Sequence, residues 1–187
     1  MKLLPLSTPE VFELVASWLA RKENYQWLDF GNGRQTVTPA LLKIMSQRDS
    51  HLMRLYTLPG TDTPIGIAGL NNVDRASGTA TLWAVAGEKS FHSRGYASIA
   101  SSKLLSIGFR DLGLRAINTW VVDHNPSLRS VERMGFRFIG RQRLCHCIDG
   151  RPHDRLLFDI LAEEHRELEV GRRRDRRAPQ PDAEAVS

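Results

Sequence analysis

The sequence predicts a single α+β domain with a mixed, mostly antiparallel sheet flanked by helices on both faces. Two segments with helical spacing of apolar residues open the chain, and three strand-like segments then follow one another without a helix between them. A strong hairpin signal, Asp149-Gly150, lies between the last two strand-like segments. With 187 residues, the chain is long enough for one domain with a sizeable core and short for two.

The first half of the chain is expected to hold two helices and a three-stranded meander. After a short extended segment, the run Ser7-Thr8-Pro9-Glu10 marks a helix start, and the following apolar residues share one helical face: Val11, Leu14, Val15, Trp18 and Leu19. A loop then carries Tyr25, Trp27, Asp29 and Phe30, and a second helix starts near Thr38-Pro39 and ends before Asp49. Strands are expected over residues 51–58, 64–73 and 79–86, because turn residues separate these three segments.

The second half is expected to add a helix, a strand, a short helix and a hairpin. Their predicted ranges are 95–111, 115–122, 125–134, and 136–148 with 151–161. Gly135 is the left-handed residue that commonly ends a helix. We therefore expect one domain over residues 1–165, followed by a charged tail over residues 166–187 whose Arg-rich part, from about residue 170, lacks apolar periodicity and is predicted to be disordered.

Composition excludes some classes of protein and leaves others open. The hydrophobic share of 41% and charged share of 25% are those of a globular chain, and no apolar run approaches the roughly 20 residues of a membrane helix. Only two cysteines occur, Cys145 and Cys147, which favours a reducing cytoplasm. The net charge of +5 suits a ligand with several phosphates as well as it suits nucleic acid.

The most informative segment is His92-Ser93-Arg94-Gly95-Tyr96-Ala97, between a predicted strand and a predicted helix. Unpaired N–H groups in the first turn of a helix bind anions, and a glycine lets the backbone approach a pyrophosphate closely. Lys89 and Arg94 add positive charge nearby. Taken alone, the hexapeptide could equally be an ordinary strand-to-helix turn with a capping serine.

A second segment, Asn125-Pro126-Ser127 through Glu132-Arg133-Met134-Gly135-Phe136, makes the pattern specific. Together and in this order, the two segments resemble the GNAT superfamily of N-acetyltransferases, whose pyrophosphate loop reads Arg/Gln-x-x-Gly-x-Gly/Ala. The chain departs from that pattern at His92, a position that acts mainly through its backbone. The wording around Gly95 resembles the branch that includes ribosomal-protein N-terminal acetyltransferases. The resemblance implies a GNAT-like fold with acetyl-CoA as acyl donor.

The resemblance also implies which residues contact the coenzyme. The expected contacts are Val85, His92, Ser93, Arg94, Gly95, Tyr96, Ala97, Ser98 and Asn125. Residues 83–86 would offer a strand edge to the pantetheine arm, with a backbone N–H near Val85 polarising the thioester carbonyl. Asn125 would contact the pantetheine, although the spacing also allows His124 to take that position, and Asn125 alternatively reads as a plain helix cap.

Direct acyl transfer needs a base for the amine and a proton for the departing thiolate. Glu88 is the preferred base among four candidates, the others being Asp29, Asp74 and His92. Many relatives supply the proton from a tyrosine at the position of Val131, so Ser127 is expected to serve here. The acceptor is expected to bind between the first two helices and the hairpin, beside Tyr25, Trp27, Asp29 and Phe30.

The expected partners are coenzyme A and a small-molecule or peptide amine: a protein N-terminus, an amino sugar or aminoglycoside, a polyamine or another small amine. A homodimer is compatible with the sequence, whereas membrane and nucleic-acid binding are disfavoured. The rival hypothesis is a non-catalytic acyl-CoA sensor or partner-binding module. No metal is expected, because in a strand Cys145 and Cys147 face one side and His146 the other.

Overall fold

The computed structural model describes residues 1–30 and 37–169, which build one open sheet. The seven strands lie in the order β1-β2-β3-β4-β5-β7-β6, and β4–β5 is the parallel pair among antiparallel neighbours. Their bounds are Leu3–Leu4, Leu52–Thr57, Pro64–Asp74, Thr79–Ala86, Ala116–Val122, Arg137–Ile148 and Arg151–Leu161 for β1 to β7. The predicted mixed, mostly antiparallel sheet is therefore confirmed.

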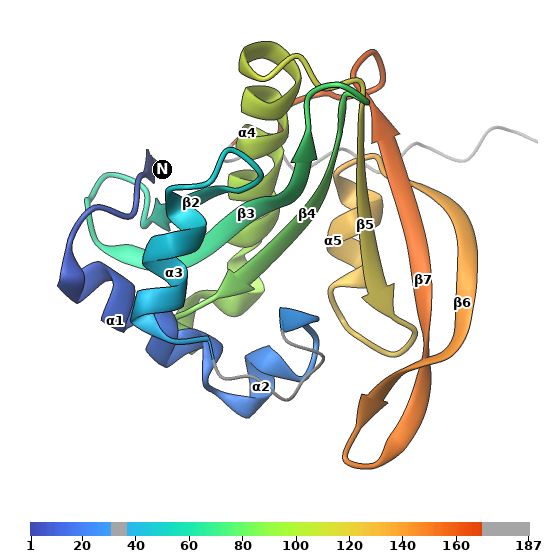
Figure 1. The fold of residues 1–187 in the computed structure, drawn as a ribbon, viewed down its shortest axis with the longest axis horizontal. Helices are drawn as coiled ribbons and strands as arrows, with labels where there is room; N and C mark the ends of the chain where they lie inside the picture. The colour runs from blue at the N-terminus through green and yellow to red at the C-terminus, as the bar shows by residue number, and fades with distance from the viewer. Residues whose placement is uncertain (31–36, 170–187) are drawn as a thin grey trace, which may run out of the picture.

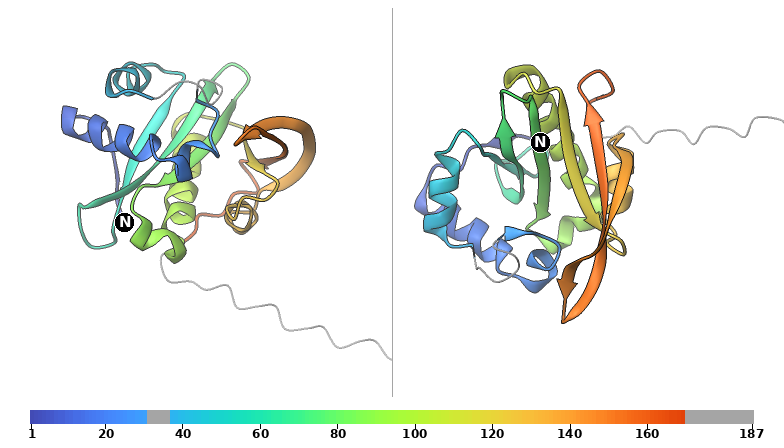
Figure 2. Two further views of the ribbon diagram at one scale, coloured as in Figure 1. Left: turned by 90° about the horizontal axis from the view of Figure 1, so that it is seen from below. Right: turned by 45° about the vertical axis from the view of Figure 1, so that its right-hand side comes forward.

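Helices cover both faces of this sheet, as predicted (Figures 1 and 2). The first face carries α1 (Pro9–Leu19), α2 (Lys22–Tyr25) and α3 (Pro39–Ser46), whereas α4 (Tyr96–Asp111) and α5 (Leu128–Arg133) cover the second. The hydroxyl oxygens of Thr8 and Thr38 accept hydrogen bonds from backbone N–H groups three residues on, which explains where α1 and α3 start. Among the described residues, no helix is long and apolar enough to cross a membrane.

Three details differ from the expected elements. The start of the predicted loop, up to Tyr25, forms the short helix α2, and residues 89–94 form a 3₁₀ helix, η2 (Lys89–Arg94). The helix expected from Asn125 begins only at Leu128, because the Asn125 side chain accepts a hydrogen bond from the Ser127 N–H at 2.8 Å and holds a turn there.

The two ends of the second half follow the sequence closely. Asp149 and Gly150 have φ values of +51° and +75°, so the predicted hairpin turn is confirmed. The packed chain continues past residue 165, since the Leu168 N–H donates to the Ser102 hydroxyl on α4 at 2.9 Å. The segment predicted to be disordered, from about residue 170, lies outside the described residues.

Strands β4 and β5 separate at their carboxyl ends, and this separation positions the site. The two strands pair only from Thr79 with Ala116 to Thr81 with Asn118. One residue further on, the Thr119 hydroxyl donates to the Leu82 carbonyl at 3.0 Å. We call the opening beyond this bond the fork; there, the β4 edge from Trp83 to Ala86 has no strand partner on the β5 side.

Candidate functional site

The backbone of Ala84, and not that of Val85, faces the fork. The Leu82 carbonyl points toward β5, because it accepts from Thr119. Backbone polar groups alternate along an antiparallel strand, so those of Ala84 and Ala86 share this direction. The Val85 carbonyl points the other way and accepts from the Tyr56 hydroxyl at 3.2 Å. The backbone N–H near Val85 that faces the fork is therefore that of Ala84.

Two side chains, the buried Tyr56 and the exposed His92, hold this edge in shape. Burial raises the pKa of Tyr56, so its hydroxyl stays protonated and keeps donating to Val85. At the end of β4, the His92 imidazole Nε2 lies 2.8 Å from the Ala86 carbonyl. Only a protonated nitrogen can bond a carbonyl, so Nε2 donates. His92 thus ties η2 to the open edge through its side chain.

The predicted phosphate turn has the geometry of an anion seat. Gly95 ends η2 and precedes α4 with φ +74°, a left-handed conformation that favours glycine. The first-turn N–H groups of α4, from Tyr96, Ala97 and Ser98, have no partner within the helix. The residues 92–98 expected to hold the pyrophosphate therefore lie together at the start of α4, where the helix dipole also favours an anion.

A second guanidinium at this seat was missed by the sequence analysis. A Cβ at position 95 would lie 2.7 Å from Nη1 of Arg133, which α5 brings over the turn. Arg94 approaches from η2, with its guanidinium 5.8 Å from the Phe91 ring centroid. Lys89 instead pairs with Glu23 at 2.8 Å, so its charge is partly compensated. Since Arg133 lies 38 residues from Gly95 in sequence, no local pattern could have found it.

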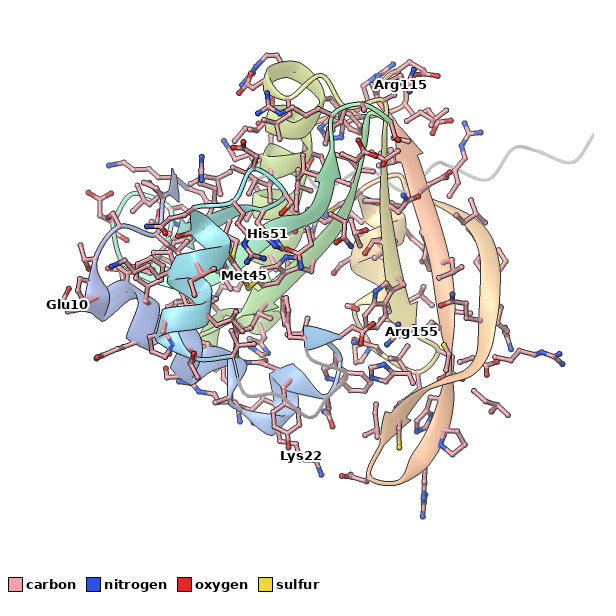
Figure 3. The ribbon with its side chains drawn as sticks, in the orientation of Figure 1. Glu10, Lys22, Met45, His51, Arg115 and Arg155 are labelled. Carbon is pink, nitrogen blue, oxygen red and sulfur yellow. The ribbon has the colours of Figure 1, made fainter. Side chains whose placement is uncertain are left out.

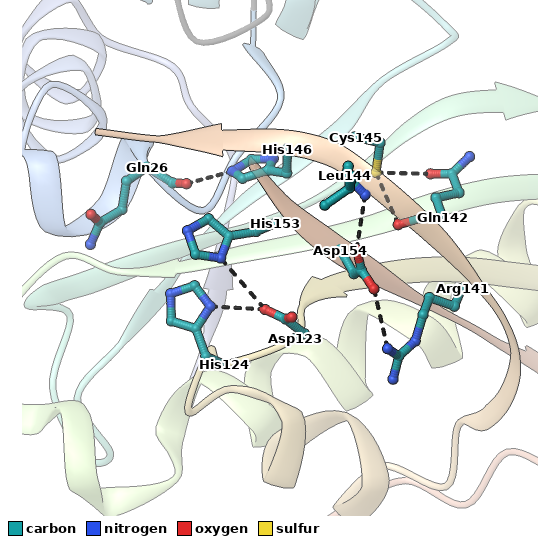
Figure 4. Close-up of polar contacts among 10 residues, drawn as sticks. All are labelled: Gln26, Asp123, His124, Arg141, Gln142, Leu144, Cys145, His146, His153 and Asp154. Carbon is teal, nitrogen blue, oxygen red and sulfur yellow. Dashed lines mark hydrogen bonds and ion pairs between the residues drawn. The ribbon is translucent and has the colours of Figure 1, made fainter. Parts of the chain in front are cut away.

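The residues expected near the pantetheine follow β5 at the other side of the fork (Figure 4). His124 Nδ1 lies 2.9 Å from the Asp123 carboxylate, and this hydrogen bond lowers the pKa of Asp123. Asn125 uses its carbonyl oxygen in the local turn, which leaves its amide N–H groups as donors. Ser127 is exposed and caps no helix N–H through its side chain.

The same region contains a group that the sequence did not predict. Ligand atoms of Asp123, His124 and His153 lie within 4.8 Å of one another, a spacing that a metal ion could bridge. His124 also contacts the Trp27 ring edge-on at 5.2 Å between centroids. The hairpin pattern considered for zinc behaves as predicted: Cys145 and Cys147 are exposed and His146 is buried.

Two tryptophans border the fork on the face of the sheet that carries α1 to α3. Thr81 and Asn118 are partners, so Trp83 and Trp120, two residues further along each strand, project to the same face. Phe30 packs edge-on against Trp83 with ring centroids 4.9 Å apart. Aromatic side chains of β4, β5 and the first loop therefore lie on the face of the sheet beside the fork.

Arg155 of β7 joins this face to the first loop (Figure 3). Its guanidinium lies 3.9 Å from the Trp120 ring centroid and donates to Asp29 at 2.9 Å. It also donates to Nδ1 of His146, whose Nε2 bonds the Gln26 carbonyl at 2.7 Å. Burial lowers the pKa of His146, with the charge of Arg155 adding to the effect.

The four candidate bases have different partners in the structure. Glu88 lies just past the open edge and accepts from the Trp18 indole at 2.9 Å. Asp29 is paired with Arg155, and His92 is bonded to Ala86. Asp74 accepts from two N–H groups of the β3–β4 turn, at the opposite end of these strands from the fork. Geometry therefore disfavours Asp74 and leaves Glu88 next to the coenzyme edge.

A pocket of about 190 Å³ opens beside Trp83. Its apolar wall consists of Phe30, Val37, Leu41 and Met45, and its polar wall of Asp29, His51 and Asn71. The Asn71 side-chain oxygen accepts from both the Trp83 indole and His51, at 2.9 and 3.0 Å. A cavity therefore lies beside the first loop and α3, where the acceptor was expected, but none of the described residues that line it belongs to the hairpin.

Comparisons of the sequence with family models and with curated proteins both match acetyltransferases. The model of a family described as acetyltransferase (GNAT) domain matches residues 2–137. An uncharacterized N-acetyltransferase p20 of Bacillus licheniformis is 32% identical over 106 residues, or 56% of this chain and 59% of that protein. The aligned part is thus less than two thirds of the length of that relative.

Solved structures share the fold. A spermidine N-acetyltransferase of Vibrio cholerae in complex with CoA and spermine superposes with a TM-score of 0.76 at 16% identity, covering 87% of this chain and 96% of that one. A GCN5-related N-acetyltransferase of Brucella melitensis gives a TM-score of 0.66 at 24% identity, covering 87% of this chain and 76% of that one.

Proposed function

The chain belongs to the GNAT acetyltransferase family, and from this premise we propose that it transfers the acetyl group of acetyl-CoA to a primary amine. The observation that carries the proposal is the anion seat at Gly95, placed at the end of an unpaired β4 edge. The pyrophosphate would bind the first turn of α4 with Arg94 and Arg133, and the pantetheine would lie along β4 as an added strand.

The reaction forms a C–N bond and breaks the C–S bond of the thioester. The backbone N–H of Ala84 would stabilise the oxygen of the tetrahedral intermediate from the open edge. Glu88 is the proposed base that takes a proton from the ammonium group and so leaves the neutral amine that attacks, and Ser127 is the proposed proton donor to the departing thiolate. Asn125 and His124 lie at the fork, where either could contact the pantetheine.

The acceptor stays open between a protein N-terminus, an amino sugar or aminoglycoside, a polyamine and another small amine. The ribosomal-protein branch suggested by residues 93–97 favours the first, whereas spermidine N-acetyltransferases are among the proteins with this fold.

Calorimetric titration with acetyl-CoA tests the coenzyme seat through two matched glycine variants. Gly95→Glu adds a side chain and a negative charge where the pyrophosphate would bind, so we expect its dissociation constant to rise more than about 100-fold. Gly113→Glu suffers the same left-handed strain, with φ +67° and nothing within 4 Å of its Cβ, and should bind normally. A folded wild-type protein that does not bind acetyl-CoA would contradict the proposal.

Thiol release distinguishes an enzyme from an acyl-CoA sensor. An enzyme releases coenzyme A when an acceptable amine is added, whereas a sensor binds acetyl-CoA and releases none. In Glu88→Gln we expect kcat/KM to fall by roughly 100-fold, with an unchanged dissociation constant for acetyl-CoA. A Glu88→Gln variant with normal turnover would move the base to another residue, and His124→Gln would be measured next because Asp123 orients that imidazole.

A further inference from the structure

The pocket beside Trp83 is mostly apolar and small, and its chemistry restricts the acceptor. Its apolar wall comes from the first loop and from one face of α3, where Met45 is buried. Figure 3 shows Met45 and His51 beside α3, and both residues line the pocket. An apolar cavity of about 150 Å³ is enough to hold benzene. A cavity of about 190 Å³ therefore accommodates one ring-sized group.

The pocket lies next to Trp83, the residue that borders the fork. Phe30, part of the apolar wall, contacts the Trp83 ring, and Trp83 is the second residue past the last β4–β5 pair. In the polar wall, the side-chain oxygen of Asn71 already accepts hydrogen bonds from His51 and from the Trp83 indole. The carboxylate of Asp29, bonded to Arg155 through Oδ2, is then the charged group at the pocket.

Three carboxylates around this face already form ion pairs with cations of the chain. Asp29 binds Arg155, Glu23 binds Lys89 and Asp149 binds Lys22, at 2.9, 2.8 and 2.7 Å. Residues 31–36, which lie outside the described structure, contain no acidic residue in the sequence. A polyamine needs several carboxylates to replace the water around its charges. Capturing one here would require breaking existing ion pairs.

We propose that the acceptor is a small primary monoamine carrying one ring-sized apolar group, such as an arylalkylamine or a branched alkylamine. This inference rests on the proposed acetyl transfer. The apolar group fills the cavity between Phe30 and α3, and the amino group points toward the fork past Trp83. Burial of the apolar group favours such an amine over a small polar one by on the order of 10- to 100-fold.

The first experiment measures coenzyme A release with 2-phenylethylamine, 3-methylbutylamine, methylamine and spermidine. The two apolar amines should exceed methylamine and spermidine by at least about 10-fold in kcat/KM. Faster turnover of spermidine would overturn the inference while supporting acetyl transfer. Release with none of the amines would count against acetyl transfer, and calorimetric binding of 2-phenylethylamine would then decide about the pocket independently.

Two tryptophan variants on α3 locate the binding. Met45→Trp extends into the cavity, whereas Ile44→Trp adds the same bulk to a neighbouring side chain that is 48% exposed. We expect Met45→Trp to weaken 2-phenylethylamine at least about 10-fold, in KM or in the calorimetric dissociation constant. Ile44→Trp should match the wild type, and both variants should keep their affinity for acetyl-CoA. Equal amine affinity in the two variants would overturn the proposal, with Leu41→Phe as a second filling variant should Met45→Trp not fold.

Discussion

Backbone groups form the phosphate turn, residues 92–98, whereas side chains form the acceptor face, which we define as the residues that line the pocket together with Arg155 and Trp120. Both regions border the fork. The turn consists of consecutive residues, 92–98, whose backbone N–H groups and one glycine form the anion seat. The acceptor face is assembled from side chains of the first loop, α3, β3, β4, β5 and β7, joined by Arg155. The backbone of the turn is therefore local, with Arg133 added to it from α5, whereas the acceptor face depends on tertiary contacts throughout.

The two regions should therefore respond differently to substitution. A change in the backbone of the turn should impair the turn and leave the remainder of the protein little affected. The acceptor face depends on residues that are distant in sequence, so loss of its central residue should reduce stability as well as specificity.

The largest effect on stability is expected for Arg155→Ala. The substitution removes a guanidinium stacked on Trp120 and leaves Asp29 and His146 without their donor. We expect the free energy of unfolding to fall by about 2–3 kcal/mol, measured by urea denaturation. Arg155→Lys should be intermediate, because an ammonium cannot reproduce the planar stack and fork of bonds.

Arg151→Ala provides the control, since Arg151 lies on the same strand and is exposed. If Arg155→Ala lost no more stability than Arg151→Ala, the joining role of Arg155 would be wrong. If it also weakened acetyl-CoA binding, the two regions would not be independent.

The same contrast explains what the sequence could predict. Helix starts at Thr8 and Thr38, the Asp149-Gly150 turn and the glycine of the phosphate turn all depend on neighbouring residues, and the sequence located each of them. The position of Arg133 over Gly95 depends on the packing of α5 beside α4, and the stacking of Arg155 on Trp120 depends on the pairing of β7 with β5. No local spacing in the sequence encodes either contact. The direction of the backbone groups at Val85 likewise depends on the register of β4 with β3, which the sequence does not specify.

A smaller effect is expected at the apex of the fork. Thr119→Val removes the hydroxyl that donates to the Leu82 carbonyl and leaves that carbonyl without its partner from β5. We expect a loss of about 1 kcal/mol in urea denaturation, and a smaller loss in Thr119→Ser, which keeps the hydroxyl. Because the bond sets where β4 and β5 separate, Thr119→Val should also weaken acetyl-CoA binding modestly. Equal stabilities of the Val and Ser variants would show that the bond does not hold the apex.

The smallest effect is confined to acidic pH and concerns His146. Its Nε2–H donates to Gln26 and its Nδ1 accepts from Arg155, so protonation at Nδ1 would set a charge against the guanidinium. Burial lowers the pKa of His146 in the folded protein, whereas the unfolded chain keeps a value of about 6.5. Below that pH the unfolded state binds more protons. The free energy of unfolding should therefore be highest at neutral pH and fall as the pH drops below about 6.5.

His146→Gln keeps a donor and an acceptor without titrating, and its unfolding free energy should depend less steeply on pH from 7 to 5. Some dependence must persist, because burial lowers the pKa of His165 on the opposite face as well. An identical slope in the variant and the wild type would assign the acid sensitivity to His165, and would place it away from the acceptor face.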